Sequence, residues 1–136
     1  MAKVRTRCIT ILGKKNLDCS DGSPQTVYTV PAGERHIPTH VIFDNASATL
    51  ATAIADMGFA SPNFDDFRKG VVFTNVDAAG EGLEVRRDTD DDGGVTPVPG
   101  LQRAGIAADD FKVHFTTTIA GTVDVYVLGI DAVAPT

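Results

Sequence analysis

The end of the chain most limits the fold, because two runs alternate apolar and polar residues there, at residues 111–115 and 122–127. A period of two residues places side chains alternately on opposite faces of a β-strand. Since Ala120-Gly121 lies between the runs, we predict a closing β-hairpin with one buried face. The residues expected to point inward are Phe111, Val113, Phe115, Val123, Val125 and Val127.

Other segments rich in β-branched residues, bounded by glycine, proline or aspartate, predict more strands. We place them at residues 3–12, 25–30, 35–43, 71–76 and 83–87, and at 47–59, where alanine content leaves a helix as the alternative. Ser61, Pro62 and Gly70 carry the start and stop signals of one short helix. These elements predict an all-β fold: a single-domain β-sandwich, jelly-roll-like, with about eight strands and one short helix.

Length and charge narrow the class of protein. The 136 residues suit one domain spanning residues 1–136, and 43% of them are hydrophobic. There are 12 Lys plus Arg against 18 Asp plus Glu, a net charge of -6, which disfavours binding to nucleic acid through its phosphates. The sequence has neither an apolar run near 18 residues nor a signal-peptide core, so we expect no membrane partner and synthesis in a cytoplasm.

The two cysteines agree with a reducing compartment. Cys8 and Cys19 are expected to be free thiols, with a disulfide between them as the alternative if their strands face each other. Neither has enough further ligands of the right type nearby in the sequence, so no metal site is expected at either.

Basic residues are concentrated at the start of the chain. Lys3, Arg5 and Arg7 lie in residues 1–7, which we interpret as an N-terminal arm available for contact with a partner. The alternative is a solvated strand face with no partner.

Residues 88–110 are rich in aspartate, glycine and proline, and we expect one long exposed loop there. Asp88, Asp90 and Asp92 precede Gly93 in the D-x-D-x-D-G pattern that begins a calcium loop. Position 12 is Pro99, where a calcium loop needs a bidentate glutamate. We therefore favour a solvated acidic loop and no cofactor, and keep calcium as the alternative.

No pattern of catalytic residues stands out. The sequence lacks G-x-S-x-G and a phosphate-binding glycine loop. His36, His40 and His114 could be imagined as a metal triad, but two of them share a predicted strand at a spacing too long for one ion. We expect that the chain is not an enzyme.

One stretch resembles a recurrent element of small virion proteins of tailed bacteriophages. It runs from Val27 through Val30-Pro31-Ala32-Gly33 to Arg35, and continues at residues 40–47 with a strand that ends in an Asp44-Asn45 turn. The resemblance implies a jelly-roll or related sandwich that decorates or cements a capsid. It also implies a homo-oligomer, with a trimer favoured, and it brings no catalytic residues.

On this basis we expect a capsid decoration or cement protein at the surface of the virion, bound between subunits of the major capsid protein. A tail or head-fibre component is the first alternative. A calcium- or carbohydrate-binding β-sandwich module is the second, with the acidic loop as its site.

Overall fold

The computed structural model describes residues 9–86, 90–91, 96–97, 105–106 and 108–133. Its strands are β1 (Thr10–Asp18), β2 (Gln25–Thr29), β3 (Glu34–Asp44), β4 (Ile54–Gly58), β5 (Arg68–Val72), β6 (Leu83–Arg86), β7 (Asp90–Asp91), β8 (Thr96–Pro97), β9 (Gly105–Ile106), β10 (Asp110–Thr117) and β11 (Thr122–Val133). No described residue belongs to a helix, so none of them contributes to a helix that could span a membrane.

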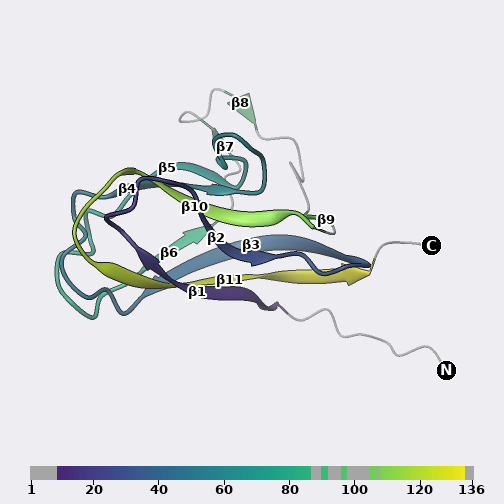
Figure 1. Ribbon diagram of the computed structural model, residues 1–136, viewed down its shortest axis with the longest axis horizontal. Coiled ribbons are helices and arrows are strands. Elements are labelled where there is room, and N and C mark those ends of the chain that lie inside the picture. The colour runs from purple at the N-terminus through teal and green to yellow at the C-terminus, as the bar shows by residue number, and fades with distance from the viewer. Residues whose placement is uncertain (1–8, 87–89, 92–95, 98–104, 107, 134–136) are drawn as a thin grey trace.

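The eight longer strands form two antiparallel sheets, in the orders β1-β11-β3-β6 and β2-β10-β4-β5 (Figure 1). The two-residue strand β9 adds to β3, and β7 pairs with β8 apart from both sheets. Among the eight longer strands, the first pairs with the last, the second with the seventh, the third with the sixth and the fourth with the fifth. This nested pairing is a two-stranded ribbon rolled into a jelly roll, and it confirms the predicted fold class.

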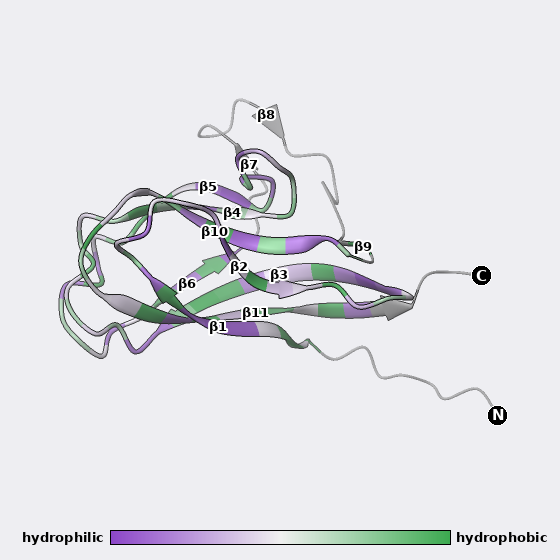
Figure 2. Cartoon of the chain, viewed as in Figure 1, coloured by the Kyte–Doolittle hydropathy of each residue, from purple (hydrophilic) through white to green (hydrophobic). Residues whose placement is uncertain are grey.

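Strands β10 and β11 alternate in hydropathy as the sequence predicted (Figure 2). All six residues expected to point inward are at most 1% exposed. The predicted hairpin is nevertheless wrong, because β10 pairs with β2 and β4 while β11 pairs with β1 and β3. A period of two residues reveals a buried face but does not identify the neighbouring strand, and residues 118–121 instead carry the chain from one sheet to the other.

Aromatic rings fill the space between the sheets. The ring centroid of Phe111 lies 5.2 Å from that of Phe59, 5.9 Å from that of Phe67 and 6.1 Å from that of Tyr28. Phe111 itself is fully buried. The ring of Phe111 on β10 therefore packs against β2 and against both ends of the segment that connects β4 to β5.

The first strand extends further than predicted. The predicted strand at residues 3–12 stopped before Gly13, but β1 continues to Asp18, and the register of its pairing with β11 shifts between Ile11 and Gly13. A Cβ atom on Gly13 would lie 2.3 Å from the ring of Tyr28. Glycine here marks a close approach between β1 and an aromatic ring inside a strand, and not the end of the strand.

The predicted short helix at residues 61–70 is also wrong. The chain forms a turn there and then enters β5. One carboxylate oxygen of Asp66 accepts the backbone N–H groups of Phe59 at 2.7 Å and Ala60 at 3.2 Å, and Phe64 has a φ of 52°. A side chain that holds the backbone in a tight turn competes with helical hydrogen bonding.

Candidate functional site

Several residues singled out by the sequence lie outside the described residues: Lys3, Arg5, Arg7, Cys8, Asp88 and Asp92. The third aspartate, Asp90, begins β7 and lies opposite Pro97 of β8. The expected loop at 88–110 therefore contains three two-residue strands. The basic arm and the calcium site stay predictions.

Exposed apolar side chains mark the sheet edges. Ile9 is 53% exposed and Ile11 is 56% exposed, at the start of edge strand β1. Val72 on edge strand β5 and Ile106 on β9 are the other large apolar residues exposed in the described part of the chain. Edge strands offer unpaired backbone groups, and apolar side chains beside them favour contact with another protein.

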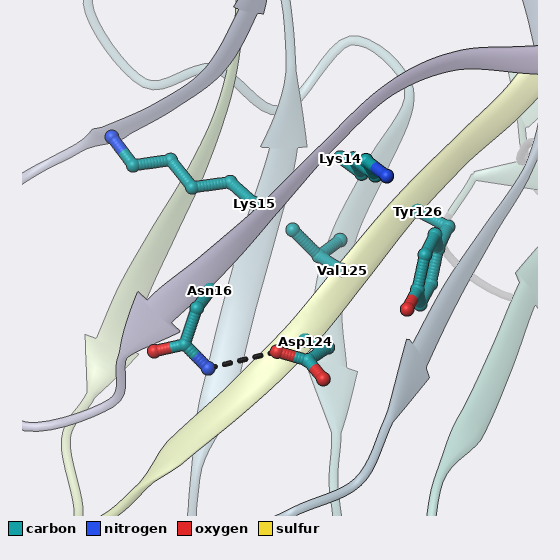
Figure 3. Close-up of a pocket in the computed structure, with 6 residues that line it drawn as sticks. All are labelled: Lys14, Lys15, Asn16, Asp124, Val125 and Tyr126. Atoms are coloured by element: carbon teal, nitrogen blue, oxygen red, sulfur yellow. Dashed lines mark hydrogen bonds between the residues drawn. The ribbon is translucent and has the colours of Figure 1, made fainter.

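A shallow hollow of ≈ 290 Å³ lies over the neighbouring strands β1 and β11 (Figure 3). Lys14, Lys15 and Tyr126 line it together with an Asn16–Asp124 pair. The Asn16 side-chain amide donates to Asp124 at 2.9 Å. Ligand pockets for small molecules usually span about 300–1,000 Å³ and are mostly apolar, so this hollow lies at the small end of that range, and its mixed polar lining suits contact with a protein better.

The three histidines do not gather into one site. His40 lies with Nε2 3.6 Å from a carboxylate oxygen of Glu84 on the neighbouring strand β6. His114 belongs to the other sheet, and its Nε2 lies 3.0 Å from the carbonyl oxygen of Gly22. Only His36 belongs to a group of metal-ligating side chains that we find among the described residues.

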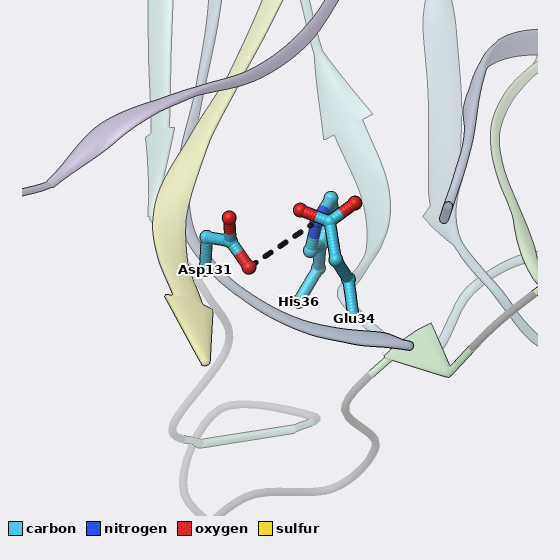
Figure 4. Close-up of side chains that lie close together, drawn as sticks. All are labelled: Glu34, His36 and Asp131. Carbon is cyan, nitrogen blue, oxygen red and sulfur yellow. Dashed lines mark ion pairs between the residues drawn. The ribbon is translucent and has the colours of Figure 1, made fainter. Parts of the chain in front are cut away.

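That group consists of Glu34, His36 and Asp131 (Figure 4). His36 and Asp131 lie directly opposite each other in the pairing of β3 with β11, and Glu34 lies two residues from His36 on the same face of β3. Nε2 of His36 is 3.7 Å from Oε1 of Glu34 and 3.9 Å from Oδ1 of Asp131. We call these three residues the β3–β11 cluster.

The β3–β11 cluster lies on the core side of its sheet, at the end of the sandwich where β3 begins and β11 ends. His36 is only 4% exposed, whereas the side chains of Glu34 and Asp131 are each 31% exposed. Nδ1 of His36 lies 3.3 Å from the hydroxyl of Tyr28 on β2, which belongs to the opposite sheet. Burial raises the pKa of that hydroxyl, so Tyr28 stays protonated and neutral.

The sequence reasoning missed Glu34 and Asp131, although a signal for both was present. Asp131 continues the inward phase of Val123, Val125 and Val127 along one strand. Glu34 and His36 are two residues apart, which places them on one face of a strand. Where polar residues replace apolar ones at the inward-facing positions near the end of a strand, they indicate a polar site at the open end of the core.

Cys19 is a buried free thiol directly after β1. Burial raises its pKa to about 11, so the thiol is protonated at neutral pH. A buried neutral thiol packs as a small apolar residue, and Cys19 belongs to the core cluster.

Comparison with known proteins gives one fold-level finding. No protein-family model matches the chain, and no curated protein does. A chain in a solved structure described as the capsid of Ralstonia phage GP4 is similar in fold, with a TM-score of 0.50 and 12% sequence identity. The similarity covers 97% of this chain and 91% of the other. At that identity, the likeness establishes a shared fold.

Proposed function

We propose that this chain is a non-enzymatic structural protein of a bacteriophage capsid, and within that class a decoration or cement protein. The proposal rests on the similarity in fold between this chain and a chain of a phage capsid, which covers 97% of this chain. The resemblance of the Val30–Gly33 turn and its flanking strands to small phage virion proteins supports the same class independently.

The proposed mechanism is the burial of surface between copies of the major capsid protein at the outside of the head. A stable protein interface buries about 1,600 Å² in total. Binding that requires the assembled shell stabilises the shell by mass action, because the free subunits gain nothing from it. The symmetry of the shell repeats that gain at every equivalent position.

The surface that we assign to this contact is the β1 edge, defined as Ile9, Ile11, Lys14 and Lys15, together with the N-terminal arm. The exposed isoleucines supply apolar area, and the lysines suit an acidic partner surface. Lys3, Arg5 and Arg7 of the arm precede this edge directly in the sequence and would add to its positive charge.

The proposal includes a homo-oligomer, with a trimer favoured. A trimer would place three β1 edges around one axis and would match a threefold junction of capsid subunits. Light scattering on the purified chain tests this part separately: a mass near three times 14.3 kDa supports it, and a monomer mass at all concentrations contradicts it.

The contact surface is tested by co-sedimentation of variants with heads that lack this protein. Deletion of residues 1–7 and the substitution Ile11→Ser are each expected to weaken binding at least tenfold. Val72→Ser is the matched control, because Val72 is equally exposed at 56% but lies on the distant edge strand β5. Binding that is unchanged by the deletion and by Ile11→Ser, or reduced only by Val72→Ser, would contradict the assignment of the β1 edge.

A further inference from the structure

A buried histidine nitrogen in the β3–β11 cluster has no hydrogen-bond partner among the described residues. Nε2 of His36 and Oδ1 of Asp131 are both inaccessible to water and unpaired by hydrogen bonds. Their separation of 3.9 Å is too long for a hydrogen bond, as is the 3.7 Å from Nε2 to Glu34. Buried polar atoms are nearly always satisfied in proteins, so this pair requires an explanation.

The choice of histidine tautomer does not remove the problem. If Nδ1 carries the proton, it donates to the Tyr28 hydroxyl, and Nε2 presents a lone pair toward two carboxylates. If Nε2 carries the proton, it faces carboxylates that lie beyond hydrogen-bond distance. A cation between the three side chains satisfies all of them at once.

We propose that Glu34, His36 and Asp131 form a zinc-binding site. Zinc binds imidazole nitrogen at about 2.0–2.1 Å and carboxylate oxygen at about 2.0–2.2 Å, so ligand atoms on a tetrahedral ion lie about 3.3 Å apart. Nε2 of His36 lies 3.7 Å from Oε1 of Glu34 and 3.9 Å from Oδ1 of Asp131, which is slightly more than this distance. Rotation of the two carboxylate groups is enough to bring their oxygens to the distance that zinc requires. All three ligand atoms lie within 4.8 Å of one another.

The surroundings favour zinc over calcium. An imidazole ligand suits zinc, whereas calcium takes oxygen ligands. Two carboxylates balance the charge of a divalent ion, and the hydroxyl of Tyr28 holds the other ring nitrogen, as the outer partners of metal-bound histidines do. The partial exposure of both carboxylates gives the ion a path from solvent and leaves a fourth position for water.

A bound ion would link the beginning of β3 to the end of β11, at the mouth of the sandwich (Figure 4). With Tyr28 on β2, the link would reach from one sheet to the other. The site would therefore be structural, and its loading would stabilise the fold in proportion to the free metal concentration. This inference is independent of the proposed capsid role.

The test is calorimetric titration of the full chain, freed of metal by a chelator, with zinc chloride at pH 7.5. We expect one saturable zinc per chain. His36→Gln and Asp131→Asn should each weaken binding at least tenfold, and Tyr28→Phe should weaken it by about tenfold. The matched control is His40→Gln on the same strand, because the part of the chain that the structure describes places Glu84 beside His40 but no third metal-ligating side chain, and this variant should bind zinc as the wild type does.

Two further measurements keep the test decisive if a variant folds poorly. Thermal unfolding of each metal-free variant establishes that it is folded before titration, and the visible spectrum of bound Co²⁺ reports a tetrahedral site that includes nitrogen and oxygen ligands. An absence of saturable zinc binding by the wild type would overturn the proposal. So would binding that survives both His36→Gln and Asp131→Asn, or that is lost equally in His40→Gln.

Discussion

The hydroxyl of Tyr28 lies 3.3 Å from Nδ1 of His36, and this contact joins strand β2 of one sheet to strand β3 of the other. The two rings are also in contact, with centroids 5.5 Å apart. The ring of Tyr28 also packs against the ring of Phe111, whereas the Tyr28 hydroxyl contacts His36. The contribution of the hydroxyl can therefore be separated from that of the ring.

Tyr28→Phe is predicted to lower the free energy of unfolding by about 0.5–1.5 kcal/mol, since it removes one hydrogen bond and keeps the ring. Urea denaturation of metal-free protein measures the change. Tyr126→Phe is the control, because Tyr126 alternates with the buried Val125 and Val127 and therefore lies on the outer face of β11, away from the other sheet, and it should leave stability nearly unchanged. Equal losses in the two variants would show that the contact with His36 contributes nothing specific.

Phe111→Ala is predicted to cost about 3–5 kcal/mol, because it empties a fully buried site at the centre of the aromatic group. The adjacent residue Lys112 points to the other face of β10, with its ammonium 4.9 Å from the ring centroid of Phe64. Lys112→Ala should cost no more than about 1 kcal/mol. Chemical denaturation of both variants tests the assignment of faces, and similar costs for the two would contradict it.

Gly13→Ala is predicted to destabilise the protein by about 1–3 kcal/mol, since the added Cβ would lie 2.3 Å from the Tyr28 ring. At Gly22 the nearest atom to an added Cβ is 3.6 Å away, which is ordinary contact. Gly22→Ala should therefore stay within about 0.5 kcal/mol of the wild type. A Gly13→Ala variant as stable as Gly22→Ala would mean that β1 and Tyr28 do not approach each other so closely.

Stability is predicted to fall at alkaline pH through Cys19. Burial raises the pKa of its thiol from the ordinary 9.0 to about 11 in the folded chain. Between pH 9 and pH 11 the unfolded chain loses the proton while the folded chain keeps it, so the free energy of unfolding decreases as the pH rises through this window. Denaturation at pH 7, 9 and 10.5 measures the effect, and Cys19→Ala should have a shallower decline over the same range. Identical slopes would contradict the assignment.

The sequence was sufficient for the fold class and for the inward face of β10 and β11, because burial of one face imposes a period of two residues. It was insufficient for the partner of each strand. Phe111 and Val123 are both buried, yet their strands lie in opposite sheets. Strand pairing depends on how the whole two-stranded ribbon folds into the jelly roll, and no local sequence pattern near residues 118–121 indicates it.

The missed features have a similar physical origin. In the sequence, Gly13 indicates a turn and the segment around Asp66 indicates a helix. In the fold, a group that is distant in the sequence packs against each of them, and a different local structure forms. The ring of Tyr28 explains the glycine, and the backbone of Phe59 explains the aspartate. The β3–β11 cluster combines residues about 95 positions apart, so only the strand register brings Glu34 and His36 to Asp131.

The central claim, that this chain decorates an assembled capsid, is tested most directly by comparing its binding to assembled heads and to unassembled major capsid protein. Under the proposed function, both would come from the phage that carries this chain, prepared without it, and sedimentation would measure the bound amount. We predict saturable binding to the heads at a fixed ratio to capsid subunits, and binding at least a hundredfold weaker to the unassembled protein. Absence of saturable binding to heads, or equal affinity for the free subunits, would contradict the account.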